Sequence, residues 1–405
     1  MGYKIIILSY LYKEYLSDFY RKNPVVKELP FFDHYNLLLN DSSETVTSYT
    51  RTLNELGIES KGIISNDNLL SNKWLYENRP TGKSVFDPVS EQIKDVRPDI
   101  LWIDNIKYLN KDWLDQIRDT VPSIKKIIAS QNAPYNTNII SGLREVDMLF
   151  TCTPGLRDFF INQGINTYLL YHGFDKSFLK RIESFKAPSE HNFIFSGSLF
   201  LGSGYHNERI GFIEEILDSD LKLDIFGNIE PFRRIFAKKS FYYLFQILKK
   251  LKLDNYVDLS SFFKKYENYK EYRFKGYSKK LKKSIVPPVF GLEMFKLLQN
   301  SRIVLNTHGE IAGNWAGNMR LFEATGVGTC LITDNKRNMV DLFTPDHEVV
   351  LYDRVEECIE KVKWLLDHEK ERKAISESGQ IRTLRDHTVE ERCKQIIEII
   401  SKELG

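Results

Sequence analysis

An alternation of short apolar runs with amphipathic helical stretches fills the amino-terminal half of the chain and constrains the fold most. Lys4–Ser9 and Ile100–Asp104 have the length and composition of buried strands, whereas Thr45–Leu56 repeats apolar residues at helical spacing and ends at Gly57. Further strand-like runs are Ser60–Ser65, Ile124–Ser130 and Asp147–Thr151. Parallel strands need helical crossovers, which cover both faces of the sheet. The pattern therefore predicts an α/β fold whose ligands bind at the carboxyl ends of parallel strands.

The length of the chain and a second series of α/β elements predict two domains. A chain of 405 residues is too long for one ordinary domain. Residues 1–185 would form one Rossmann-like domain, 190–387 a second, and 388–405 a terminal helix. Thr388 and Glu391 have the spacing of a capping box at the start of that helix.

The segment His308–Asp334 combines a glycine-spaced polar loop, a short helix and an apolar strand. Asn318 suits the N-cap of that helix, and Gly326 suits its C-terminal stop. The helix N-terminus would point into the loop, where unpaired N–H groups and partial positive charge favour a diphosphate. Arg320 and Glu323 lie three residues apart and share a face of the helix. An arginine beside phosphates and a carboxylate that accepts from ribose hydroxyls could together bind a nucleotide.

The spacing alone leaves a second interpretation open, an ordinary α/β loop with an Arg–Glu pair on the surface. The segment contains neither a Walker lysine motif nor a GxGxxG pattern. Residue types and spacing therefore do not decide between a nucleotide site and a structural loop.

A longer series of short sequence motifs extends from this segment toward the carboxyl terminus. It comprises Asn318–Gly326, Leu331–Asp334, Leu342–Phe343, Glu348–Tyr352, Gly379–Gln380 and His387–Thr388. In order and content these residues resemble the carboxyl-terminal half of GT-B glycosyltransferases of group 1, in particular the proteins similar to the spore maturation protein CgeB. The resemblance implies two Rossmann-like domains with a cleft between them and a terminal helix that crosses back onto the first domain. It also implies transfer of a sugar from a nucleoside diphosphate donor to a hydroxyl of a glycan, a lipid-linked saccharide or a protein.

The same resemblance assigns a set of donor-binding residues, which is Ser198, Arg209, Asn314, Gly317, Asn318, Arg320 and Glu323. Glu323 would hold the ribose, since it stands where the family has the second of two glutamates separated by seven residues. The first would fall at Trp315, so Glu310 would reach the sugar instead, together with His308. This departure leaves a retaining or an inverting outcome open. For Arg209, a solvated position on a helix is the alternative to a phosphate contact.

An inverting transfer requires a base for the acceptor hydroxyl. His34 lies in a stretch that we interpret as a loop after the first strand, near the expected cleft, with Asp33 beside it as an orienting partner. The catalytic candidates are therefore His34, Asp33, His308 and Glu310. A surface histidine among aromatic residues is the alternative interpretation of His34.

The stretch 231–283 differs in charge from the rest of the chain. Its 16 Lys and Arg against four acidic residues give a net charge of +12, whereas the whole chain carries +2, so the remainder is −10. An apolar stripe at helical spacing runs from Phe241 to Leu251, with Lys249, Lys250 and Lys252 elsewhere on the helix. Such a helix can lie on an anionic membrane, or its stripe can pack onto the domain. Nucleic acid is not the expected partner, because no RNA-binding motif or zinc pattern accompanies the charge.

Composition and cysteine usage exclude several classes of protein. An apolar content of 42% with 28% charged residues is typical of a globular chain. The longest early apolar run, Ile5–Leu8, is too short for a signal sequence or a membrane span. The four cysteines form no CxxC pair, and no metal-ligand spacing occurs, which favours reduced thiols in a cytoplasmic protein. We expect a metal-independent enzyme without a cofactor, associated peripherally with the inner membrane face.

Two other functions fit the same residues. A sugar-nucleotide epimerase of this fold would use the same donor contacts without an acceptor. A non-catalytic coat-maturation or interaction protein would keep the fold without turnover, and Trp315 at the position of an expected glutamate favours that interpretation.

Overall fold

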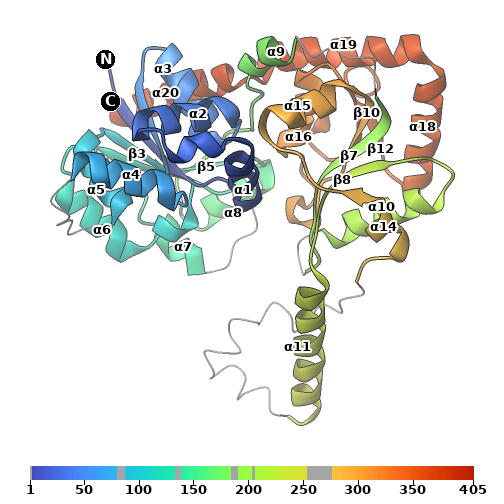
Figure 1. Ribbon diagram of the computed structural model, residues 1–405, viewed down its shortest axis with the longest axis horizontal. Helices are drawn as coiled ribbons and strands as arrows, with labels where there is room; N and C mark the ends of the chain where they lie inside the picture. Colours follow the sequence, from blue (N-terminus) through green and yellow to red (C-terminus); the bar gives the residue numbers. More distant parts are fainter. Residues whose placement is uncertain (1, 80–86, 133–137, 184–189, 203–205, 253–275) are drawn as a thin grey trace.

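The computed structural model describes residues 2–79, 87–132, 138–183, 190–202, 206–252 and 276–405. It contains two α/β domains, each built on a six-stranded parallel sheet (Figure 1). None of the helices among these residues is long and apolar enough to cross a membrane.

The first domain has the strand order β2-β1-β3-β4-β5-β6. Its strands are β1 (Lys4–Ser9), β2 (Glu59–Ile64), β3 (Ile100–Ile103), β4 (Lys126–Ser130), β5 (Met148–Thr151) and β6 (Thr167–Leu169). Its helices are α1 (Lys13–Lys22), α2 (Phe31–Asp41), α3 (Thr45–Glu55), α4 (Asn68–Asn78), α5 (Pro88–Val96), α6 (Lys111–Thr120), α7 (Asn138–Leu143) and α8 (Pro154–Asn162). Ile5 and Ile7 enter one hydrophobic cluster, whereas Ile6 and Leu8 enter another. The continuous apolar run in β1 thus reflects a strand that is buried on both faces.

The second domain has the strand order β12-β11-β10-β7-β8-β9. Its strands are β7 (His191–Leu199), β8 (Asp224–Ile229), β9 (Ile285–Val286), β10 (Ser301–Asn306), β11 (Cys330–Asp334) and β12 (Val350–Tyr352). Its helices are α10 (Asn207–Asp218), α11 (Phe232–Lys250), α14 (Lys279–Ser284), α15 (Gly291–Gln299), α16 (Met319–Gly326), α17 (Met339–Leu342), α18 (Val355–Asp367) and α19 (Glu369–Asp386). The short helix α9 (Ser177–Ile182) lies between the two sheets in the chain.

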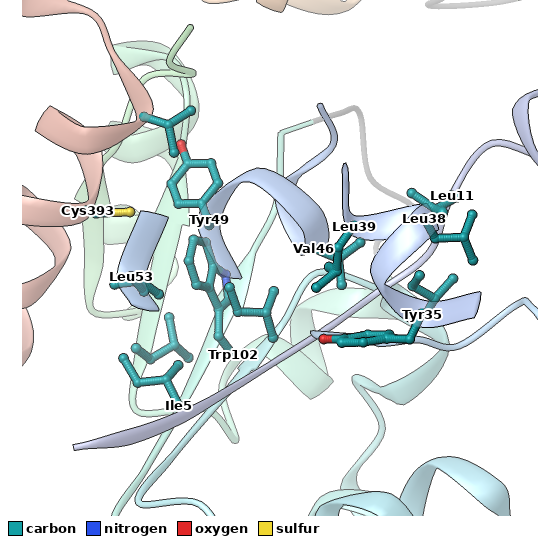
Figure 2. Close-up of a cluster of buried hydrophobic side chains, with 14 of the residues drawn as sticks. Ile5, Leu11, Tyr35, Leu38, Leu39, Val46, Tyr49, Leu53, Trp102 and Cys393 are labelled. Carbon is teal, nitrogen blue, oxygen red and sulfur yellow. The ribbon is translucent and has the colours of Figure 1, made fainter. Parts of the chain in front are cut away.

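The terminal helix α20 (Val389–Leu404) belongs to the core of the first domain, although it follows the second domain in sequence. In Figure 1, α19 runs along the second domain and α20 continues over the first. Figure 2 shows Cys393 of α20 beside Leu53 and Tyr49 of α3. The hydroxyl of Thr388 accepts from the backbone N–H of Glu391 at 3.2 Å, as the capping-box spacing predicts. Helix α20 therefore continues the chain from the second domain and packs against the first through buried apolar contacts.

Substitution of Ile396 tests this connection. Ile396 is fully buried in the first-domain cluster. We expect Ile396→Ala to lower the free energy of unfolding by about 2–5 kcal/mol, because a cavity would replace the side chain. The matched control is Ile381→Ala on α19, whose side chain is 64% exposed and which should change stability by less than about 0.5 kcal/mol. Urea unfolding curves measure both, and equal shifts would mean that α20 does not pack as described.

Candidate functional site

A cavity of about 300 Å³ lies between the two domains. The first domain lines it with residues after β1 and between α2 and α3, which are Tyr12, Glu14, Tyr15, Ser42, Ser43 and Glu44. The second domain lines it at the carboxyl ends of β7, β8 and β10 and with the start of α16, including Ser196, Ser198, Arg209, Asn228, Asn306, Thr307, Asn318, Arg320 and Glu323. A ligand there would thus sit where parallel α/β sheets bind ligands. Five of the seven residues assigned to the donor are in this wall.

Arg320 has unused hydrogen-bonding capacity beside the cavity. Its Nη2 donates to the carbonyl of Ser196 at 3.2 Å, and its Nη1 lies 3.0 Å from the carboxylate of Glu323. That contact is an ion pair without hydrogen-bonding geometry, so Nε and Nη1 are buried without an acceptor among the described residues. An unpaired buried donor on a charged group is costly. An anion such as a diphosphate would supply the missing acceptors.

Arg209 is held by the backbone at two strand ends. Its Nε and Nη2 donate to the carbonyl of Thr307 at 3.0 and 2.7 Å, and its Nη1 donates to the carbonyl of Ser198 at 3.2 Å. Burial lowers the pKa of Arg209 to about 10, so the side chain keeps its charge at neutral pH. Arg209 does not take the solvated position on α10 that the sequence left open. Its charge instead adds to that of Arg320 on the same wall.

Asn318 precedes α16, but its side chain does not cap the helix. The amide Nδ2 donates to Oδ1 of Asn306 at 2.6 Å, and Asn306 in turn donates to the hydroxyl of Thr333 at 2.9 Å. Asn318 is therefore the N-cap residue, as predicted, but its amide oxygen accepts from Nδ2 of Asn306 at 3.3 Å instead of from the helix backbone. The N-terminus of α16 faces the cavity without a side-chain cap, and it favours an anion.

His308, Glu310 and Asn314 are outside the cavity wall, in contrast to the expectation that they reach the sugar. His308 is buried, and its Nδ1 lies 2.7 Å from Asp334. Glu310 accepts from the backbone N–H of Glu208 at 3.1 Å, so it stabilises the first turn of α10 instead. The side chain of Asn314 is exposed. These three residues lie in the loop between β10 and α16, and only the fold of that loop decides that they are outside the cavity wall.

The glycine loop before α16 contacts the first domain. A Cβ atom on Gly317 would collide with the carbonyl oxygen of Cys152, and a Cβ atom on Gly155 would collide with the indole of Trp315. Gly317 thus permits a close approach of the two domains. Gly317 does not line the cavity. It therefore does not provide the contact between this loop and a diphosphate that we expected.

The interpretation of His34 as a loop residue at the cleft is wrong. It lies in α2 and is fully buried, with Nε2 3.0 Å from the hydroxyl of Tyr20, which donates to Asp67 at 2.6 Å. Burial lowers the pKa of His34 to about 4. Asp33 is exposed on another face of α2 and cannot orient the ring. The spacing of Phe31, Tyr35, Leu38 and Leu39 is helical and could have revealed this.

Glu44 is an acidic cavity residue that the sequence analysis missed. It stands at the N-cap of α3, half-buried, on the first-domain wall. Burial, followed by the charges of Glu323 and Asp104, raises the pKa of Glu44 to about 8. No described residue donates a hydrogen bond to its carboxylate. In sequence, an acidic residue before a helical stretch indicates only a cap, so its neighbours in space were needed to identify it.

No group of three or more His, Cys, Asp and Glu side chains that could hold a metal ion occurs in the described part of the chain. All four cysteines are free and buried.

Comparison with known proteins adds a family match over the carboxyl-terminal part of the chain. Residues 246–398 match the family model described as glycosyl transferase-like. This stretch contains α16 with Arg320 and Glu323, and it confirms the resemblance that those residues indicated. The narrower resemblance to the CgeB group stays a prediction. No curated protein matches the chain.

Solved structures resemble the chain over its whole length. One is the Anabaena protein HepE in complex with UDP-glucose, with a TM-score of 0.56 and 12% identity over 99% of this chain and 100% of that one. A glycosyltransferase from Rickettsia africae has a TM-score of 0.56 and 12% identity over 100% and 99%. Sucrose-phosphate synthase from Thermosynechococcus elongatus has a TM-score of 0.55 and 9% identity over 99% and 98%. At such identities the likeness establishes the fold, which is the two-domain GT-B arrangement that the sequence predicted.

Proposed function

We propose that this chain, whose fold is that of the GT-B glycosyltransferases, transfers a sugar from a nucleoside diphosphate sugar to an acceptor hydroxyl. The observation that carries the proposal is that Nε and Nη1 of Arg320, in the wall of the interdomain cavity, have no hydrogen-bond acceptor among the described residues. Arg209 and the uncapped start of α16 add positive charge beside it. A site with two arginines and a helix N-terminus favours a diphosphate, which is the leaving group of such donors.

The donor would lie against the second domain. Arg320 would bind the diphosphate through Nε and Nη1, which have no hydrogen-bond acceptor among the described residues, and Arg209 would oppose the negative charge that grows as the bond to the anomeric carbon breaks. Glu323, which now pairs with Arg320, would accept hydrogen bonds from the ribose hydroxyls. We further propose that the chain needs no metal ion or cofactor for this step.

Glu44 would act on the acceptor from the first domain. The acceptor oxygen attacks the anomeric carbon, the bond from that carbon to the diphosphate breaks, and the hydroxyl proton passes to the Glu44 carboxylate. A base whose pKa lies near the working pH takes such a proton most effectively. Its place across the cavity from Arg320 and Glu323 supports this role, and the transfer would then invert the anomeric configuration.

Incubation of the full chain with a panel of nucleoside diphosphate sugars tests the function. The complex of HepE with UDP-glucose makes UDP-glucose the first donor to try. We expect selective binding in a thermal-shift assay, since a ligand specific to the native state raises its melting temperature. Release of the nucleoside diphosphate should require an acceptor such as a glycan, a lipid-linked saccharide or a protein.

The two alternatives predict other results. An epimerase would convert the sugar of the donor in the absence of any acceptor. A non-catalytic interaction protein would show no binding of nucleoside diphosphates or their sugars, and that result would overturn the proposal. A cytoplasmic location, where nucleoside diphosphate sugars are the natural donors, is part of the same proposal.

A further inference from the structure

Helix α11 stands apart from the second domain as an arm. Figure 1 shows it extending away from both sheets, and its 19 residues would span roughly 28 Å at 1.5 Å per residue. Of the basic stretch 231–283, residues 253–275 lie outside the described residues, which include the arm and α14.

A buried ion pair fixes the root of the arm. Nζ of Lys238 lies 2.6 and 2.8 Å from the two carboxylate oxygens of Glu230, and it also donates to the carbonyl of Leu201 at 2.7 Å. Ile235 is buried on the same side of the helix. The backbone N–H of Glu230 donates to the hydroxyl of Tyr277, just before the lysine-rich helix α14. The direction of the arm is therefore set by the body of the domain.

The arm exposes one apolar face. Its members are Phe232 (75% exposed), Phe236 (60%), Tyr243 (53%), Leu244 (37%), Ile247 (55%) and Leu251 (61%), which recur at helical spacing. The sequence predicted an apolar stripe from Phe241 to Leu251. This stripe is only partly exposed, because Phe245 is buried and Phe241 and Leu248 are half-buried. Burial of Ile235 and Lys238 rotates the helix, so that the row beginning at Phe232 faces outward.

The charge of the arm is of one sign. Apart from Lys238, whose charge is paired with Glu230, the helix contains Arg233, Arg234, Lys239, Lys249 and Lys250 and no acidic residue, and Lys252 lies two residues after its end. Helix α14 adds Lys279, Lys280, Lys282 and Lys283. A second copy of the chain on the same face would bring these like charges together. Nucleic acid would neutralise the positive charge but would leave Leu244, Ile247 and Leu251 without an apolar partner.

We propose that α11 docks on a membrane surface rich in anionic lipid, with its exposed apolar face in the boundary between headgroups and acyl chains. Aromatic side chains favour that boundary, and flanking Lys and Arg attract anionic headgroups. Several cations and the apolar face together give reversible binding. The arm thus meets both chemical requirements of an interfacial helix.

The position of the arm extends the inference to the acceptor, and this step rests on the proposed function. Asn228 at the end of β8 lines the interdomain cavity, and α11 begins four residues later at Phe232. Docking would therefore hold the second domain, and with it the donor wall, close to the lipid surface. A lipid-linked saccharide is the acceptor class that such a placement favours.

Vesicle co-sedimentation of the full chain tests the docking. Vesicles that contain phosphatidylglycerol should retain the protein at about 0.01 M salt and release most of it at about 1 M, where the Debye length falls from roughly 30 Å to 3 Å. Phosphatidylcholine vesicles should retain little. The combined variant Phe232→Ser, Phe236→Ser, Ile247→Ser leaves the charge unchanged and should lower retention at least tenfold, and Lys249→Glu with Lys250→Glu should do the same.

Matched controls carry the same changes elsewhere on the surface. Phe32→Ser, Tyr76→Ser and Val340→Ser remove exposed apolar side chains, and Lys370→Glu with Lys402→Glu reverses exposed charges. These controls should bind as the parent does. The docking would be overturned if neutral and anionic vesicles retained the protein equally, or if the controls lost as much retention as the arm variants. It would also be overturned if the protein dimerised with rising concentration and the arm variant abolished that dimerisation.

An activity measurement separates the docking from the proposed function. The arm variant should transfer sugar to a soluble acceptor at the parental rate and to a lipid-linked acceptor in vesicles at least tenfold more slowly. If the protein bound vesicles but transferred no sugar to either acceptor, the docking would stand and the proposed glycosyltransferase activity would be overturned. If the arm variant used the lipid-linked acceptor as well as the soluble one at the parental rate, the assignment of a lipid-linked acceptor would be overturned.

Discussion

Replacement of Glu44 by Gln should lower kcat by about 10²–10⁴-fold and leave the affinity for the nucleoside diphosphate donor nearly unchanged. The reason is positional, because Glu44 lines the cavity from the first domain, whereas the donor contacts come from the second. Gln preserves the size and polarity of the side chain but cannot accept the hydroxyl proton. Steady-state kinetics with a saturating donor, together with calorimetry of nucleoside diphosphate binding, measure the two effects separately.

The pH profile gives an independent measurement of the same role. Burial and the charges of Glu323 and Asp104 raise the pKa of Glu44 to about 8, and only its deprotonated form can act as the base. The value of kcat/KM should therefore rise as the pH increases toward 8 and level off above it, and the Glu44→Gln variant should lose that rise. Glu14→Gln is the matched control, because Glu14 lines the same cavity but is exposed. A parental rate in Glu44→Gln, or an equal loss in Glu14→Gln, would remove Glu44 as the base.

Replacement of Glu323 by Gln should weaken binding of a nucleoside diphosphate by about 1.5–3 kcal/mol, roughly 10- to 150-fold. Glu323 is buried in the cavity wall, where a charged acceptor for ribose hydroxyls is shielded from water. Arg320→Gln should weaken binding comparably, because it removes Nε and Nη1, for which the described residues supply no hydrogen-bond acceptor. Isothermal titration calorimetry measures both variants.

The control for this prediction is Glu310→Gln. Glu310 lies near the position at which the family would have a sugar contact, yet its carboxylate accepts from the start of α10 and is outside the cavity wall. Its replacement should leave donor affinity within a few-fold of the parent. If Glu310→Gln weakens binding as strongly as Glu323→Gln, the donor extends beyond the described cavity and the assignment of the site is incomplete.

Local sequence patterns were sufficient for most strands of the first sheet and for the shared helix face of Arg320 and Glu323. The four consecutive apolar residues of β1 predict a strand buried on both faces, because side chains alternate between the faces of a strand. Arg320 and Glu323 share a helix face through their spacing, and that face meets the cavity. Both inferences depend on contacts within one element or on a periodicity that the backbone imposes. Such relations are present in the sequence before the chain folds.

The residues of the first-domain wall and the role of the glycine loop could not be predicted, because they depend on contacts between distant segments. His34 and Asp33 are neighbours in sequence, yet α2 buries the histidine and exposes the carboxylate. Gly317 suggested a phosphate loop, but the approach of Cys152 from the other domain explains the glycine. The raised pKa of Glu44 arises from burial between the domains and from carboxylates far away in the chain. The sequence by itself thus determined most strands of the first sheet and the helix that carries Arg320 and Glu323, while only the tertiary structure decided which acid lines the cavity from the first domain, because burial and electrostatic coupling depend on distances across the cleft.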